Sequence, residues 1–343
     1  MTQPDFDQGA LERWLEAHVP EISGIASIGK FPGGQSNPTY RLSSPAGNYV
    51  LRRKPFGPLL PSAHAIDREF RLISALYPTG FPVARPIALC SDPAVIGAEF
   101  YLMEMVVGRT LWNGALPDQT PPERSGIYEA IVDTLARLHG IDVQAVGLGD
   151  FGKPGNFFAR QVDRWTKQYR KSQTDDIPAV ERLIEWLPTR IPPQARNCIA
   201  HGDYRIDNLI FAGGSPQVLA VLDWELATIG DPLADLSYFA LNWSLPADGG
   251  AGLHGLDLTG TGIPALEEIV DRYQSATGMS GMLDLDWYFA FGLFRIVGIF
   301  QGIKQRMLDG NASSATASKY AALVEPFARM AWDFAERAQA KSK

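Results

Sequence analysis

The stretch of residues 199–239 constrains the fold more than any other part of the chain. A polar loop that carries Asp203 and Asn208 is followed by two short apolar runs on either side of the turn Gly213-Gly214, and the second run ends at Asp223. A Gly-Gly turn between two apolar runs favours an antiparallel hairpin. Such a hairpin brings Asn208, before its first strand, close to Asp223, after its second. We therefore expect three oxygen-bearing side chains to converge.

These three side chains suit phosphoryl transfer, in which hard oxygen ligands hold Mg²⁺ and a carboxylate orients the attacking hydroxyl. Asp203 is then the catalytic residue that takes the hydroxyl, whereas Asn208 and Asp223 bind the metal. The alternative is that His201-Gly202-Asp203 is an ordinary turn and Leu222-Asp223 an ordinary strand end. The occurrence of both in this order favours the functional interpretation.

The spacing of these residues resembles the catalytic and metal-binding loops of the aminoglycoside phosphotransferase family, whose fold is shared by choline kinases and homoserine kinases. The segment 227–236 is similar to the family's segment after the metal-binding acid. The resemblance implies an α+β, bilobal, protein-kinase-like fold, with a small lobe of antiparallel sheet and a helix and a large, mostly helical lobe. It also implies ATP and Mg²⁺ as cofactors and a small molecule with a hydroxyl group as the acceptor.

Candidate nucleotide-binding residues precede this stretch. Gly33 and Gly34, with Ser36, lie in a loop where backbone N–H groups can approach phosphate, although two glycines also make a plain hairpin. Arg52, on the next strand, matches the position of the family's phosphate-binding cation, with a solvated strand end as the alternative. Glu69 matches the helix glutamate that orients this cation, against a solvated helix charge.

The β-rich run 100–106 corresponds in the resembled fold to the last strand of the small lobe and the hinge. The C=O of Glu104 and the N–H of Val106 would then hold the adenine edge. This places an N-terminal nucleotide-binding lobe at residues 1–106 and a C-terminal catalytic and acceptor-binding lobe at residues 107–343.

Arg205, two residues after Asp203, matches the offset of a Lys in protein kinases that contacts the transferring phosphoryl group. We predict that Arg205 is catalytic and stabilises charge on the γ-phosphate. An ion pair with Asp207, or a surface position, is the alternative.

Hydrophobic periodicity predicts eight helices. They are expected over residues 6–19, 66–76, 127–139, 160–171, 180–187, 263–276, 286–308 and 315–338. In the helix 286–308, Arg295 and Arg306 lie on a face with two glycines. A buried Arg295 needs a partner, and a structural ion pair is slightly favoured over substrate binding. His139, Asp231 and Asp235 are expected to be structural.

Composition excludes several classes of protein. A chain of 343 residues with 45% hydrophobic residues predicts a globular protein with two lobes. No apolar run is long enough to span a bilayer, and the N-terminus has no secretory pattern. The net charge of -7 argues against nucleic acid as a partner, and two distant cysteines favour a reducing cytoplasm. The sequence leaves the oligomeric state open.

The acceptor is the least constrained part of the prediction. The run 59–69 is most similar to phosphotransferase modules fused to acyl-CoA dehydrogenases, which implies a hydroxylated metabolite, such as a hydroxyacyl acid or thioester. Four candidate cations, with no comparable acidic cluster, favour an anionic or neutral acceptor: Arg160, Arg164, Arg295 and Arg306. An aminoglycoside kinase or an amino-alcohol (choline-like) kinase is the alternative.

Other classes are less consistent with the sequence. A hydrolase is disfavoured because no G-x-S-x-G elbow is present. A protein kinase is disfavoured because the chain lacks an Ala-Pro-Glu segment and the path from Asp223 to Asp235 is short. A nucleotide-binding pseudokinase usually lacks one of the acids, and here Asp203, Asn208 and Asp223 are all present.

Overall fold

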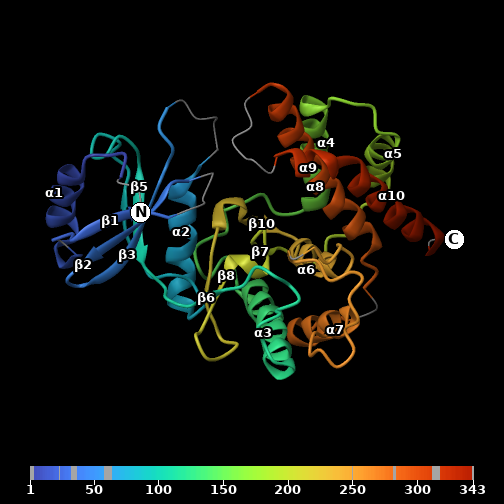
Figure 1. The fold of residues 1–343 in the computed structure, drawn as a ribbon, viewed down its shortest axis with the longest axis horizontal. Coiled ribbons are helices and arrows are strands. Elements are labelled where there is room, and N and C mark those ends of the chain that lie inside the picture. Colours follow the sequence, from blue (N-terminus) through green and yellow to red (C-terminus); the bar gives the residue numbers. More distant parts are fainter. Residues whose placement is uncertain are drawn as a thin grey trace. The chain divides into compact units, whose positions relative to one another are not determined.

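A computed structural model describes residues 4–22, 24–31, 37–57, 64–248, 250–280, 283–310 and 317–341 of the chain (Figure 1). The chain forms two compact units. Unit 1 comprises residues 1–111, 142–148 and 206–227, and unit 2 comprises residues 112–141, 149–205 and 228–343. The assignment of nucleotide binding to residues 1–106 and of catalysis to residues 107–343 stays a prediction.

Unit 1 contains a five-stranded antiparallel sheet in the order β1-β2-β3-β5-β4. Its strands are β1 (Ser27–Lys30), β2 (Thr39–Ser44), β3 (Gly47–Arg53), β4 (Pro86–Cys90) and β5 (Phe100–Glu104). On the central strand β3, Arg52 lies opposite Thr39 of β2 and Tyr101 of β5. The predicted strand cation is therefore held on both sides by ladder pairing, which fixes the direction of its side chain.

Two helices accompany this sheet. Helix α1 (Gln8–His18) begins after Asp7, whose side chain caps the Ala10 N–H, and buries Leu11 and Leu15 in the apolar core of the sheet. Helix α2 (Ile66–Leu76) has the bounds predicted from its apolar stripe. Short 3-10 helices follow each of them, η1 (Pro20–Ile22) and η2 (Tyr77–Thr79).

Arg53, the neighbour of Arg52, is almost completely buried in unit 1. Its Nη2 lies 2.7 Å from Asp5 Oδ2, and its guanidinium stacks 3.7 Å from the centre of the Phe56 ring. The two arginines of β3 therefore serve opposite faces of the strand, as strand alternation requires. Asp5 neutralises a guanidinium that would otherwise be costly to bury.

The hairpin predicted around Gly213-Gly214 is confirmed, and it belongs to unit 1. Strands β8 (Leu209–Phe211) and β9 (Val218–Val221) pair antiparallel, and β6 (Arg109–Thr110) pairs with β8. The 3-10 helices η4 (Ile206–Asn208) and η5 (Trp224–Leu226) flank the hairpin. The Leu222 N–H donates to the Asn208 C=O at 2.8 Å, so the two ends of the hairpin meet beside the predicted metal ligands.

Unit 2 is mostly helical. It contains α3 (Pro121–Gly140), α4 (Phe157–Ser172), α5 (Pro178–Trp186), α6 (Leu233–Ala240), α7 (Leu266–Thr277), α8 (Asp286–Leu308), α9 (Ala317–Ala322), α10 (Val324–Lys341), the antiparallel pair β7 (Cys198–Ala200) and β10 (Thr228–Gly230), and the 3-10 helices η3 (Leu187–Thr189) and η6 (Leu241–Trp243). Helix α8 packs against α4, α6, α9 and α10, and its first half is the apolar centre of the unit.

Three expectations need correction. The helix expected over 315–338 is two helices, because Pro326 in the first turn of α10 has no N–H to continue the hydrogen-bond ladder from α9. Helix α3 begins earlier than expected, at Pro121, where Thr120 and Glu123 form a capping box. Helix α6 was not expected, since it is short and apolar on most sides; Asp231 caps it by accepting the Leu233 N–H at 2.8 Å.

Two further expectations can be compared with the structure. Cys90 and Cys198, the two distant cysteines, are both buried and free. Across the part of the chain that the structure describes, no helix combines the length and the hydropathy needed to cross a membrane.

Candidate active site

A cluster of charges surrounds Arg52 in unit 1. Its Nε lies 2.9 Å from Glu69 Oε2, and its Nη2 lies 2.9 Å from Asp223 Oδ1 and 3.6 Å from Glu225 Oε2. Strand β3, helix α2 and the end of the hairpin supply these side chains. Because one guanidinium faces three carboxylates, the ionised cluster carries a formal excess of two negative charges.

Glu69 is buried and is held by donors from three elements. Besides Arg52, it accepts hydrogen bonds from Asn37 Nδ2 at 3.0 Å and from the Tyr101 hydroxyl at 3.2 Å. Burial raises the pKa of Glu69, and Arg52 opposes this effect. Burial alone would lower the pKa of Arg52, but the surrounding carboxylates, that of Glu69 above all, raise it. The strand cation is therefore fixed in position and permanently charged.

The two predicted metal ligands, Asn208 and Asp223, lie at the paired ends of the hairpin. Asn208 ends η4 and is buried. Asp223 has φ 64° and ψ 62°, a left-handed conformation that is uncommon for a residue with a side chain and is concentrated at functional sites. Its side chain is 39% exposed, so one face of the carboxylate remains accessible.

These two ligands fit Mg²⁺. They offer only hard oxygen atoms, and the negative excess around Arg52 equals the charge of a divalent cation. Among the described residues no group of three or more His, Cys, Asp or Glu side chains could hold a metal ion. Mg²⁺ bound here would therefore take its other ligands from phosphate and water, as it commonly does.

Other predicted nucleotide-binding residues divide into two groups. Gly33, Gly34 and Ser36 lie outside the described residues. Glu104 ends β5, where its N–H donates to the Arg85 C=O at 2.9 Å and its side chain pairs with Arg85. The N–H of Val106 makes no hydrogen bond within the described residues, so it is available to a ligand, as the adenine assignment requires.

In unit 2, Asp235 holds the loop that carries Asp203. Its carboxylate accepts the His201 N–H at 2.6 Å and the Gly202 N–H at 2.8 Å. Gly202 has φ +82°, a conformation that favours glycine, and the Asp203 N–H then donates to His201 Nδ1 at 3.2 Å. The loop backbone is thereby fixed immediately before the predicted catalytic carboxylate.

His139 supports Asp235 from α3. Its Nε2 lies 3.2 Å from Asp235 Oδ2, and its Nδ1 lies 2.6 Å from the Tyr273 hydroxyl. Burial alone would raise the pKa of Asp235, but the hydrogen bond from His139 and the charges and N–H groups around it hold that pKa below its ordinary value. His139 is thus a buried structural residue, as expected. Asp231 is structural too, and caps α6.

The side chain of Asp203 contacts those of Arg205 and Tyr238 in unit 2. Arg205 Nε lies 3.5 Å from Asp203 Oδ1, which places the guanidinium within ion-pair distance of the predicted base. Tyr238 of α6 hydrogen-bonds the Asp203 side chain; burial raises the pKa of Tyr238, and the charge of Asp203 raises it further. The Tyr238 hydroxyl is therefore protonated and can donate to the carboxylate.

Arg295 does not form the expected ion pair with any described residue. Its guanidinium lies 4.9 Å from the centre of the Tyr238 ring and 5.5 Å from that of the Trp165 ring. The reason is that α8 faces aromatic side chains here, and their ring faces attract a cation without a carboxylate. Arg295 is thereby positioned beside a partner of Asp203.

The other candidate cations differ in their surroundings. Arg160 donates to the C=O groups of Gly155 and Lys153 and so stabilises the loop before α4. Arg164 lies over the Trp165 ring, 5.7 Å from its centre. Of the four arginines, Arg295 is the one in contact with Tyr238.

Three residues at these sites were given no role from the sequence. Glu225 could have been found from the sequence, because it is a second acid two positions after Asp223. Tyr101 could be found only from strand register, because it faces Arg52 across the sheet. Tyr238 was missed because helix α6, which carries it, was not predicted from the sequence.

Comparison with known proteins decides the family. Residues 27–269 match the model of the family described as "Phosphotransferase enzyme family". The chain belongs to this phosphotransferase family. Its members are kinases that act on hydroxyl groups of small molecules, so this phosphotransferase is an enzyme of that class.

Curated relatives of this phosphotransferase are longer proteins. It is 46% identical over 333 residues to "Acyl-CoA dehydrogenase family member 10" of Mus musculus, covering 96% of the chain and 31% of the relative. It is 40% identical over 343 residues to "Acyl-CoA dehydrogenase family member 11" of Homo sapiens, covering 98% of the chain and 44% of the relative. The chain thus spans less than half the length of these relatives and confirms the expected similarity to their phosphotransferase module.

Solved structures confirm the fold. A provisionally assigned aminoglycoside phosphotransferase from Ralstonia eutropha matches this phosphotransferase with a TM-score of 0.89 and 46% identity, covering 97% of this chain and 99% of that one. A thermostable mutant of the aminoglycoside phosphotransferase APH(4)-Ia, in complex with AMP-PNP and hygromycin B, matches with a TM-score of 0.62 and 13% identity, covering 95% and 98%. The latter shows the fold alone, and the predicted α+β, protein-kinase-like class is correct.

Proposed function

We propose that this phosphotransferase transfers the γ-phosphate of ATP to a hydroxyl group of a small metabolite, with Mg²⁺ as the metal. The observation that carries the proposal is the Arg52 cluster, which joins a fixed cation to Asp223 at the end of the hairpin. A nucleoside triphosphate brings negative phosphate oxygens, which Arg52 can bind, and its metal ion brings positive charge, which Asp223 can bind.

Asn208 and Asp223 would hold Mg²⁺, which neutralises charge on the phosphate oxygens when bound. Arg52 would bind phosphate oxygens through its fork, and Glu69 would keep the guanidinium in place. The loop of Gly33, Gly34 and Ser36 would cover the phosphates. The backbone of Glu104 and Val106 would hold adenine. Apart from the two metal ligands, the residues with these roles lie in the proposed nucleotide-binding lobe at residues 1–106. ATP as the phosphate donor is consistent with the AMP-PNP complex of the APH(4)-Ia mutant, which has the same fold.

Asp203 would accept the proton of the acceptor hydroxyl, within a catalytic lobe at residues 107–343. Its loop is fixed by Asp235, and it precedes Asn208 by only five residues in the sequence. Arg205, at 3.5 Å from Asp203, would stabilise negative charge on the transferring phosphoryl group.

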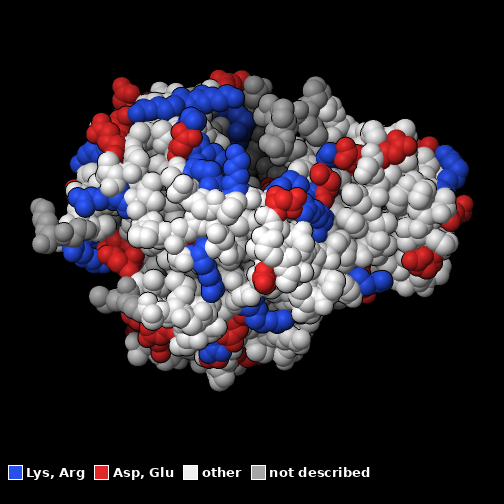
Figure 2. All heavy atoms as spheres, turned by 180° about the vertical axis from the view of Figure 1, so that it is seen from behind, with Lys and Arg blue, Asp and Glu red and all other residues white. Residues whose placement is uncertain are grey.

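For the acceptor, we infer a hydroxyacyl acid or thioester. Figure 2 shows Lys and Arg side chains gathered on the part of unit 2 that includes α4. Arg295, held over Tyr238 with no carboxylate partner among the described residues, is suited to bind an acidic group. The names of the relatives, acyl-CoA dehydrogenase family members, are consistent with an acyl substrate. An aminoglycoside or amino-alcohol would require converging carboxylates instead.

The test is a screen for ADP release across hydroxy acids, hydroxyacyl thioesters, amino alcohols and aminoglycosides, with Asp203→Asn as the blank. Turnover with the acids or thioesters, absent in the blank, supports the proposal. Arg295→Gln should then raise KM for the acidic acceptor, whereas Arg329→Gln, the same change at an exposed residue of α10, should leave KM unchanged. Turnover confined to cationic acceptors would reject the acyl assignment. We also place the enzyme in the cytoplasm, consistent with its free cysteines.

A further inference from the structure

A cavity in unit 2 lies apart from Asp203 and its partners. Its volume is about 310 Å³, near the lower end of the range for small-molecule sites. It is lined by the end of α5, the segment after η3, the start of α8 and the end of α10, through Trp186, Arg190, Pro192, Leu283, Asp284, Trp287, Tyr288, Ala338 and Gln339. All of these are described residues.

Three aromatic side chains line the cavity. Trp287 is 4% exposed and stacks on Phe291 at 5.7 Å between ring centres, and it meets the Tyr288 ring edge-on at 5.5 Å. Trp186 adds a third aromatic side chain from α5. Such walls favour a flat, apolar ligand body, because aromatic faces stack on one another.

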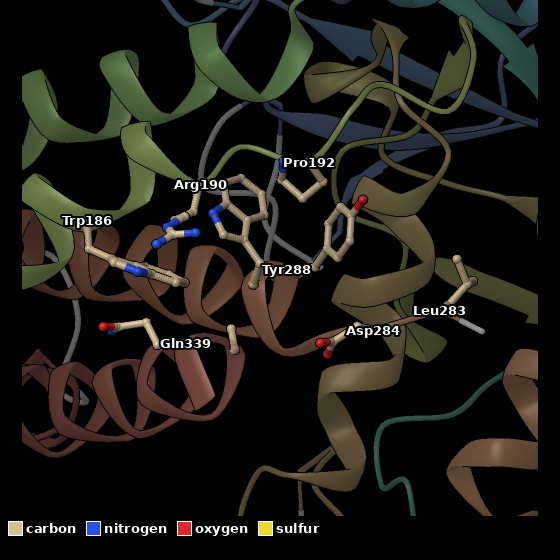
Figure 3. Close-up of a pocket in the computed structure, with 9 residues that line it drawn as sticks. Trp186, Arg190, Pro192, Leu283, Asp284, Tyr288 and Gln339 are labelled. Atoms are coloured by element: carbon tan, nitrogen blue, oxygen red, sulfur yellow. The ribbon is translucent and has the colours of Figure 1, made fainter. Parts of the chain in front are cut away.

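One acidic and one basic side chain line this cavity, and only the acidic one is in an ion pair among the described residues. Figure 3 shows Arg190 near Trp186 at one side and Asp284 towards the other. Asp284 is already paired, since Lys341 Nζ lies 2.9 Å from its Oδ1. Arg190 forms no ion pair with any described residue. The cation is therefore the group left to bind a charged ligand, and that ligand is an anion.

The indole N–H groups of Trp186 and Trp287 are closed to solvent and have no hydrogen-bond partner within the described residues. They therefore do not face the open space of the cavity, and these two residues contribute their rings to its walls. Burial raises the pKa of Tyr288, which keeps its hydroxyl protonated.

The cavity is separate from the surroundings of Asp203. Trp287 and Arg295 both lie on α8, but they are eight positions apart, or about 12 Å along the helix axis. We propose that this cavity is a second binding site, for a small planar organic carboxylate whose apolar body lies between the aromatic walls and whose carboxylate pairs with Arg190.

The experiment uses 4-fluorobenzoate as the probe and 4-fluorobenzamide, which has nearly the same shape and no charge, as the matched ligand. Each is titrated into the full chain and followed by ¹⁹F NMR. We expect saturable binding of one benzoate, with the amide at least about tenfold weaker because it cannot form the charged pair. Equal binding of the two ligands, or no saturable binding of the benzoate, would overturn the proposal.

Variants locate the site. Arg190→Gln should remove the preference for the benzoate, and Trp287→Phe, which keeps a ring to stack on Phe291, should weaken it. Arg329→Gln is the matched control on the same unit and should change nothing. If Arg190→Gln keeps the preference, or if Asp203→Asn abolishes benzoate binding while Arg190→Gln does not, the second site does not exist. Because these readouts measure binding only, they do not depend on the proposed phosphoryl transfer.

Discussion

Arg52 and Asp223 are 171 positions apart in the sequence, yet Arg52 Nη2 lies 2.9 Å from Asp223 Oδ1. The same guanidinium lies 2.9 Å from Glu69. A single side chain thus connects the central strand of the sheet, helix α2 and the end of the hairpin. A change at any of the three residues should therefore affect nucleotide binding through the other two.

Replacing Glu69 by Gln should weaken binding of Mg²⁺-ATP about tenfold or more, because the buried guanidinium loses the charge that holds it. Isothermal titration calorimetry measures this. Glu99→Gln, which removes the partner of Lys54 just beyond β3, is the control and should leave the affinity unchanged. Equal losses in the two variants would mean that Glu69 has no special role.

Asp223→Ala should abolish the dependence of ATP affinity on Mg²⁺, because this carboxylate is the anionic member of the proposed metal pair. Calorimetry with and without the metal decides the question, and the wild type without Mg²⁺ is the reference. Unchanged affinity of the variant at saturating Mg²⁺ would remove Asp223 from the site.

Asp203→Asn should keep ATP affinity and lower kcat by about 10²–10⁴-fold, the usual contribution of a general base. Steady-state kinetics with an acceptor from the screen measures kcat. Asp207→Asn, which changes an acid in the same loop, should retain most of the activity. Full turnover by Asp203→Asn would show that another group accepts the proton.

Arg205→Lys should keep part of the activity, whereas Arg205→Ala should keep very little, if the charge of Arg205 stabilises the transferring phosphoryl group. Both variants should bind ATP with similar affinity, which separates a catalytic loss from a binding loss. The same kcat in the two variants would favour a purely structural pair with Asp203.

Asp235 should make stability depend on pH at low pH. Because its pKa is lower in the folded chain than its ordinary value of 3.8, its contribution to the free energy of unfolding is complete above that value and is lost as the pH falls through the folded pKa. Asp235→Asn should cost about 2 kcal/mol or more at neutral pH, where it removes charged hydrogen bonds, and should flatten the acid side of the curve. Urea unfolding from about pH 2 to about pH 7, a range that extends below the ordinary pKa of 3.8, measures both. Identical slopes in variant and wild type would contradict the assignment.

The parts of the site that the sequence predicted depend on local patterns. The Gly-Gly turn predicted the hairpin and the meeting of its two ends, and the apolar stripe predicted α2. The pairing of Glu69 with Arg52 was implied by the family resemblance. Packing decided the rest. The aromatic environment of Arg295 and the contact of Tyr238 with Asp203 involve α4, α6 and α8, which are far apart in the sequence and whose side-chain contacts no periodicity encodes.

The contact between Arg53 and Asp5 has a practical consequence. Because Asp5 precedes the first helix, it would ordinarily be regarded as part of a dispensable tail, yet it neutralises a buried guanidinium on the strand that carries Arg52. Shortening the polypeptide to the first residue of α1 would leave that guanidinium without its counter-ion. An expressed protein should therefore retain Asp5, because its removal would affect strand β3, which is proposed to bind nucleotide.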